Sequence, residues 1–109
     1  MALYTFVTEY QGGTYIRQTE ADALPQACFQ WADQTCRHHD IPDLEETEFR
    51  EEFQNDLQEF APTALDETRN VWYMSFLVAD EMLSVNIIKT DMAEEPVFES
   101  AYRSAFYNG

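Results

Sequence analysis

The sequence predicts an α+β domain whose antiparallel sheet is made of two β-hairpins. Two segments rich in β-branched and aromatic residues, about 2–10/14–19 and 71–79/82–90, each contain a turn signal. Between them, apolar residues recur at helical spacing over about 22–36 and 43–60. The 109 residues suit a single domain, 1–109, with at least the first helix packed on one face of the sheet.

The second hairpin is the longest apolar and strand-like stretch, and we expect it at the centre of the fold. With Asp80 and Glu81 as the connection, Phe76 faces Val85 and one face of the pair is almost continuously apolar. A slip of one residue would bring polar groups into the core, so the loop should have two or four residues. Six side chains should be almost fully buried: Trp31, Trp72, Met74, Phe76, Val85 and Ile87.

The first hairpin should turn at residues 11–13, where two glycines can supply the positive φ angles of a tight turn. Its register stays open at this point. Either Tyr10 lies opposite Tyr15 or Val7 lies opposite Ile16.

The two expected helices carry recognisable start signals. In the first, Asp22 is the expected N-cap, Pro25 lies in the first turn, and Trp31 anchors the helix on the sheet. In the second, Asp43 is the expected cap and Glu46 completes a capping box. The apolar stripe of the second helix is Leu44, Phe49, Phe53, Leu57 and Phe60.

Residues 97–107 form a short C-terminal helix or a last strand. Phe98, Tyr102 and Phe106 recur every four residues, which favours a helix that starts at Pro96. The aromatic content of the same segment also suits a strand.

The charge of the chain limits its partners. The chain contains six basic and 21 acidic residues, and its net charge is −15. Such a surface disfavours nucleic acid and anionic membranes, and it attracts basic proteins through long-range steering that salt weakens. Solubility alone, or adaptation to a salty habitat, is the competing explanation.

The sequence indicates a cytoplasmic protein. Its first residues lack a basic start followed by an apolar run, and no apolar stretch approaches the ~20 residues of a membrane helix. Cys28 and Cys36 lie eight residues apart on one expected helix, too far apart to bond to each other, so both should be reduced.

Residues 36–40 are the only tight cluster of possible ligands or catalytic groups. They are Cys36, Arg37, His38, His39 and Asp40. A tetrahedral zinc site needs four spaced ligands, and no second ligand pair appears; a Cys-His nucleophile lacks an orienting residue and an oxyanion hole. We therefore expect no catalytic residue, no metal site and no cofactor.

The second helix has the highest charge density in the chain, and we expect a protein partner to bind there. Like charges four apart on a helix repel, and Arg50 alone relieves them. A solvated face of a generally acidic protein is the alternative. The expected partner-binding residues are Glu45, Glu48, Glu51, Glu52, Asp56 and Glu59.

Two stretches resemble a known group of proteins. They are YTFVTEYQGGTYIRQTEADALPQACFQWA, residues 4–32, and NVWYMSFLVADEMLSVNIIKT, residues 70–90. Together they are similar to small bacterial proteins encoded beside polymorphic or contact-dependent toxins and regarded as immunity proteins. The resemblance covers about half of the chain, and it carries over no functional residues. It implies a protein that neutralises a cognate toxin by binding it, and a strongly acidic inhibitor would suit a basic, nuclease-like toxin.

Two other classes of function compete with this one. The first is a small enzyme or metal-binding protein that uses residues 36–40, and the second is an acidic housekeeping module. Pairing with a second copy, for example through an exposed strand edge, also stays open.

Overall fold

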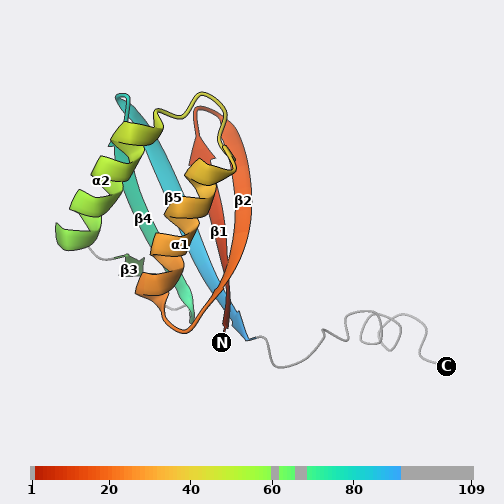
Figure 1. The fold of residues 1–109 in the computed structure, drawn as a ribbon. Coiled ribbons are helices and arrows are strands. Elements are labelled where there is room, and N and C mark those ends of the chain that lie inside the picture. Colours follow the sequence, from red (N-terminus) through yellow and green to blue (C-terminus); the bar gives the residue numbers. More distant parts are fainter. Residues whose placement is uncertain (1, 60–61, 66–68, 92–109) are drawn as a thin grey trace.

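The computed structural model describes residues 2–59, 62–65 and 69–91, and it confirms the α+β fold with its two hairpins (Figure 1). The elements are β1 (Ala2–Tyr10), β2 (Gly13–Ala21), α1 (Leu24–Arg37), α2 (Glu46–Glu59), β3 (Thr63–Ala64), β4 (Val71–Val78) and β5 (Glu81–Asp91). The five strands form one antiparallel sheet in the order β2-β1-β5-β4-β3, and both helices lie on the same face of it. The two-residue strand β3 has no counterpart in the sequence prediction.

The first hairpin adopts the register with Val7 opposite Ile16. The loop is only two residues long, because Gln11 and Gly12 both have positive φ, 50° and 81°. Two consecutive residues in this region form the tight turn whose twist matches that of the flanking strands. Gly13 therefore belongs to β2, where it pairs with Tyr10.

The second hairpin differs from the predicted register by two residues. The turn is Ala79–Asp80, with φ angles of 52° and 63°, so Phe76 lies opposite Leu83 and not opposite Val85. Because side chains alternate between the two faces, a shift of two keeps every side chain on its predicted face. The loop has two residues, one of the two predicted lengths, and it lies one residue earlier than the predicted Asp80–Glu81.

Aromatic rings join the helices to the sheet. Trp31 of α1 stacks on Phe6 of β1, with ring centroids 5.2 Å apart, and meets Phe49 of α2 edge-on at 5.5 Å. Phe49 in turn lies 5.6 Å from Phe76 of β4. Trp31, Met74, Phe76, Val85 and Ile87 are buried as predicted.

Trp72 is an exception, because it is only half-buried. Its ring lies on the helix side of the sheet, 6.4 Å from that of Tyr4. On the outer side of β4, the residue opposite Trp72 is Ala64 of the two-residue strand β3, and the small side chain of an alanine covers little of a ring.

Both helices start later than predicted. Ala23 is the N-cap of α1 without a side-chain bond, and the Asp22 amide donates to Oε1 of Gln26 at 2.9 Å. Asp43 has a φ of 63° and lies in a turn before α2, so it cannot cap that helix. Helix α2 begins at Glu46.

The opposite face of the sheet is covered by no described element, and we call it the open face. Its residues are Leu3, Thr5, Val7, Glu9, Thr14, Ile16, Gln18, Glu20, Thr63, Val71, Tyr73, Ser75, Leu77, Met82, Ser84, Asn86, Ile88 and Thr90. Neither helix of the described part of the chain is long and apolar enough to cross a membrane. Residues 97–107 lie outside the described residues.

Phe76→Ala tests the assignment of the core. Phe76 is 5% exposed between β5 and the rings of α2, so its truncation should lower the free energy of unfolding by about 3 to 5 kcal/mol. Phe29 is 56% exposed, and the same substitution there should cost only roughly 1 kcal/mol. Urea denaturation measures both values, and equal losses would show that the helices do not pack on this face.

Candidate functional site

The predicted acidic row begins at Glu45, just before α2, and continues to the last residue of that helix, Glu59. Glu45 and Glu51 are exposed, whereas Glu48 and Glu52 are half-buried. Asp56 and Glu59 belong to α2, but their side chains lie outside the described residues. The structure thus places the described members of the row on one helix, and it divides them into two exposed and two partly buried groups.

Glu48 has a structural contact that the sequence did not predict. Its Oε2 accepts a hydrogen bond from the amide of Ala79, in the turn between β4 and β5. Such a charge-assisted bond satisfies an amide that the hairpin leaves unpaired. Glu48 therefore points to the sheet and holds the turn, and it is less accessible to a partner than the exposed Glu45 and Glu51.

The turn between β4 and β5 extends the acidic surface. Asp80 and Glu81 are exposed there, next to the turn amide that binds Glu48. Burial raises the pKa of Tyr10, and the negative charges of Glu81 and Glu48 raise it further. Asp80 and Glu81 were predicted only as a connection, because nothing local in the sequence indicates which helix the turn meets.

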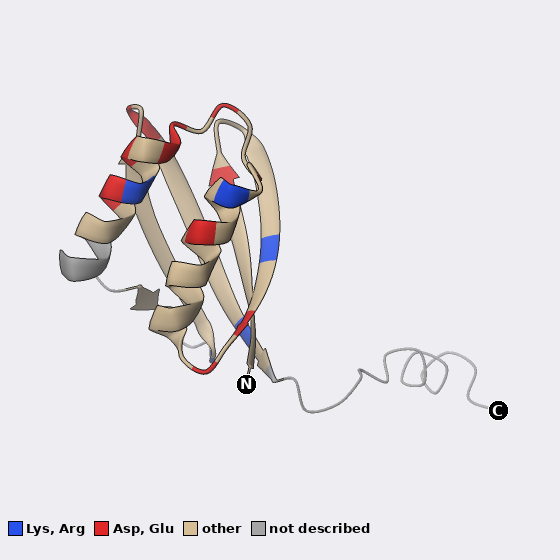
Figure 2. Ribbon diagram, in the orientation of Figure 1, with Lys and Arg blue, Asp and Glu red and all other residues tan. Residues whose placement is uncertain are grey.

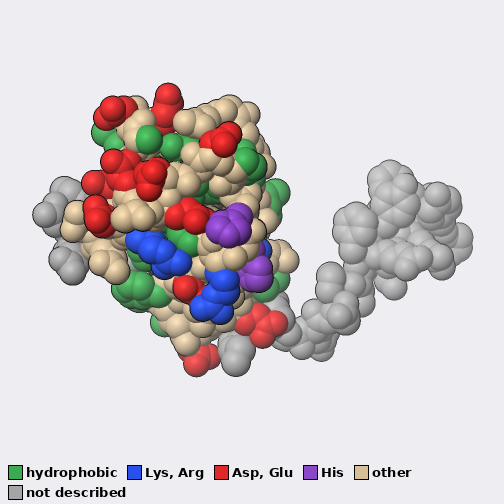
Figure 3. All heavy atoms as spheres, turned by 45° about the horizontal axis from the view of Figure 1, so that its top comes forward, with side chains coloured by type: hydrophobic (Ala, Val, Ile, Leu, Met, Phe, Trp, Pro, Cys, Tyr) green, Lys and Arg blue, Asp and Glu red, His purple; other side chains and the backbone are tan. Residues whose placement is uncertain are grey.

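We call Glu45, Glu48, Glu51, Glu52, Asp80 and Glu81 the acidic end. They come from the start of α2 and from the β4–β5 turn, which lie at the same end of the molecule (Figure 2). In Figure 3, where this end is turned forward, acidic side chains gather on one part of it and basic ones lie beside them.

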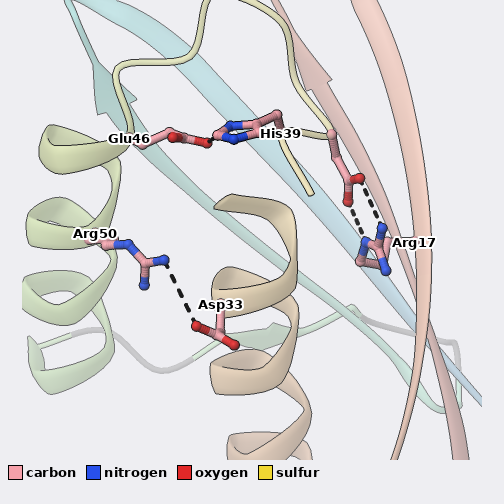
Figure 4. A network of polar contacts seen from close by, with 6 residues as sticks. Arg17, Asp33, His39, Glu46 and Arg50 are labelled. Atoms are coloured by element: carbon pink, nitrogen blue, oxygen red, sulfur yellow. Dashed lines mark hydrogen bonds and ion pairs between the residues drawn. The ribbon is translucent and has the colours of Figure 1, made fainter. Parts of the chain in front are cut away.

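The neighbouring cations bind other partners. Arg50 projects from α2 toward α1, where its Nη2 lies 3.8 Å from Oδ1 of Asp33 (Figure 4). Arg37 also pairs with Asp33, at 2.8 Å. Among the described residues, no ion pair involves a carboxylate of the acidic end, so no described cation pairs with its charge.

The groups of residues 36–40 do not converge on one point. Cys36 is buried in the core, whereas Asp40 turns to β2 and forms a two-pronged ion pair with Arg17, with Nη2 2.9 Å from Oδ1. His39 instead contacts Glu46 of α2, with Nδ1 3.0 Å from Oε2 (Figure 4). Within the described ranges, no three His, Cys, Asp or Glu side chains are placed to hold a metal ion.

Comparisons of the chain with protein-family models, curated proteins and solved structures found no match. The class that the structure defines is a small α+β protein with two helices on one face of an antiparallel sheet and an acidic end. Any function must therefore be argued from this chain alone.

The reactivity of the two thiols tests whether Cys36 can act as a nucleophile. Burial raises the pKa of Cys28 to about 12 and also raises that of Cys36. Near pH 8 the thiolate fraction of Cys28 should be about 1000-fold below that of an ordinary cysteine. Ellman's reagent should modify both thiols slowly in the folded protein and rapidly in urea. Fast modification of Cys36 in the folded state would contradict its burial and return it to the candidate nucleophiles.

Proposed function

We propose that this protein is a cytoplasmic immunity protein that binds a basic, nuclease-like toxin domain and neutralises it by occlusion. The observation that carries the proposal is the acidic end, because no described cation pairs with its charge. Glu45, Glu51, Asp80 and Glu81 are exposed there, and the nearby Arg50 is drawn toward Asp33 on the other helix. A basic protein would supply the cations that the described part of the chain does not pair with these carboxylates.

The acidic end suits fast recognition of a basic surface. Net charge and a concentrated acidic patch raise association rates by electrostatic steering, mainly at low salt. The patch also has a fixed shape, because Glu48 ties α2 to the turn that carries Asp80 and Glu81. A rigid charged surface loses little conformational freedom on binding, which favours affinity.

Binding, and not catalysis, is the activity that this surface supports. An enzyme would need a pocket in which a nucleophile or an acid–base pair meets a substrate. Cys36, His39 and Asp40 point to three different parts of the fold, and their contacts are structural. An acidic housekeeping module would not require its charges at particular positions. Charge reversals that weaken binding at one site and not at another would therefore favour the proposed function over this role.

The first test is biological and asks whether a partner exists. The reading frame next to the gene should encode a protein with a basic domain that stops growth when it is expressed alone. Coexpression of this protein should restore growth. A neighbouring product without toxicity, or toxicity that this protein does not relieve, would refute the proposed function.

The second test asks where the partner binds. Glu45→Lys/Glu51→Lys reverses two exposed charges of the acidic end and leaves Glu48 to hold the turn. We expect the association rate with the toxin domain at low salt to fall by about 10-fold or more, and its salt dependence to flatten. Stopped-flow kinetics at several salt concentrations measures both quantities.

The matched control is Glu20→Lys/Asp22→Lys, which changes the net charge equally. Glu20 and Asp22 are exposed at the end of β2, far along the sheet from the β4–β5 turn. This variant should slow association much less. Equal effects of the two variants would show that only the net charge matters, and would remove the acidic end as the binding site.

A further inference from the structure

The open face differs sharply from the rest of this acidic protein. Among its described residues, only Glu9 and Glu20 carry a charge, although the chain contains 21 acidic residues. Glu9 lies beside the β1–β2 turn and Glu20 near the far end of β2, so the middle of the face is uncharged. From β2 to β4, one row across it is Ile16, Val7, Asn86 and Tyr73, and the next is Gln18, Thr5, Ile88 and Val71.

Large apolar side chains lie unprotected on this face. Ile16 is 67% exposed, and Leu77 and Met82 are each 53% exposed. Ile16 belongs to the edge strand β2, while Leu77 and Met82 pair with each other at the end of β4 and β5. The row of Thr14, Glu9, Ser84 and Ser75 separates Ile16 from Leu77 and Met82. Single exposed apolar side chains are common on proteins, so it is the nearly uncharged face as a whole that distinguishes this surface.

Polar side chains of the open face bond to one another. Nε2 of Gln18 donates to Oγ1 of Thr5 at 3.0 Å, and the hydroxyl of Tyr73 donates to Oγ of Ser84 at 3.3 Å. The free-energy cost of removing a polar group from water is smaller when the group already has a hydrogen-bond partner. The face is therefore suited to burial against a surface that offers few hydrogen bonds.

We propose that the open face is the interface between two copies of this chain, packed sheet against sheet. Two molecules of net charge −15 repel, and they can approach closely only where both surfaces are nearly uncharged. The four long strands span roughly 30 Å by 20 Å, or roughly 600 Å² in projection, and side-chain relief raises the accessible area further. About 800 Å² per partner is usual for a stable interface.

The symmetry of such a dimer brings complementary features together. A two-fold axis parallel to the strands places β2 of one copy over β4 of the other, so that each Ile16 faces the row of Tyr73. It also carries Leu77 and Met82 toward the β1–β2 turn of the other copy. A hollow of about 380 Å³, lined by residues 9–14, Met82 and Ser84, leaves room for them there, and the one charged side chain of its lining is Glu9.

In this dimer the helices of both copies lie on the outside. The dimer does not require the proposed toxin. The same axis keeps the two acidic ends at one end of the assembly, where they repel each other. Salt should therefore strengthen the dimer by screening this repulsion, whereas it should weaken binding of a basic partner. The sign of the salt effect separates the two associations.

Sedimentation equilibrium tests the proposal. The protein should reach twice its chain mass of 12.8 kDa, with a dissociation constant that falls as salt rises. Ile16→Glu and Leu77→Glu each place a charge in the interface and should each raise the dissociation constant at least about 10-fold. Phe29→Glu, at an exposed ring on α1, should leave it unchanged.

Thermal melting of each variant checks that the fold is kept. Dissociation constants are compared only among folded variants. A wild-type protein that stays monomeric at every concentration and salt overturns the proposal, whatever else covers the face. An effect of Ile16→Glu without one of Leu77→Glu would mean pairing along the β2 edge, and would also overturn it.

Discussion

The packing of Trp31 is the interaction on which the association of helices and sheet depends. Its ring stacks on Phe6 with an interplanar angle of only 5°, and its edge meets Phe49 of the second helix. Helix α2 has six acidic residues and one arginine, so it would be unstable without such packing. Burial of Phe49 and Phe53 against Trp31 and Phe76 supplies the apolar contact that offsets this repulsion.

The same arrangement separates charge from apolar surface. The two helices and the segment between them carry most of the described carboxylates (Figure 2). The open face of the sheet is nearly uncharged. Glu48 joins helix α2 to the sheet, because its carboxylate accepts a hydrogen bond from the turn of the β4–β5 hairpin. The protein thus offers one charged end and one neutral face, which could serve two partners at once without competition.

The sequence was sufficient for the fold class and for the side of the sheet on which most residues lie. Side chains alternate between the two faces of a sheet along each strand. Phe76 and Val85 are therefore assigned to the core in the predicted register and in any register shifted from it by an even number of residues. The register itself depended on the positive φ of Ala79, which is not a usual turn residue. That turn is held by Glu48 from a helix 31 residues away, and no local pattern could indicate it.

The candidate site shows the same limit. Charge density directed attention to α2, and Glu45 and Glu51 are exposed at or near its start. The sequence could not show that Glu48 is engaged by a backbone amide, or that Arg50 turns to Asp33. Both depend on how α2 is rotated about its axis, and tertiary contacts with α1 and β4 decide that rotation.

The order of the strands also governs how the chain can fold. The pairing of β1 with β5 joins residues that are 73 to 89 positions apart, from Tyr10 with Leu83 to Ala2 with Asp91. Each hairpin can close locally within microseconds, but the ladder at the centre of the sheet needs the closure of almost the whole chain. During synthesis β1 must therefore wait with one unpaired edge until β5 has been made, and in that interval the nascent protein is open to aggregation.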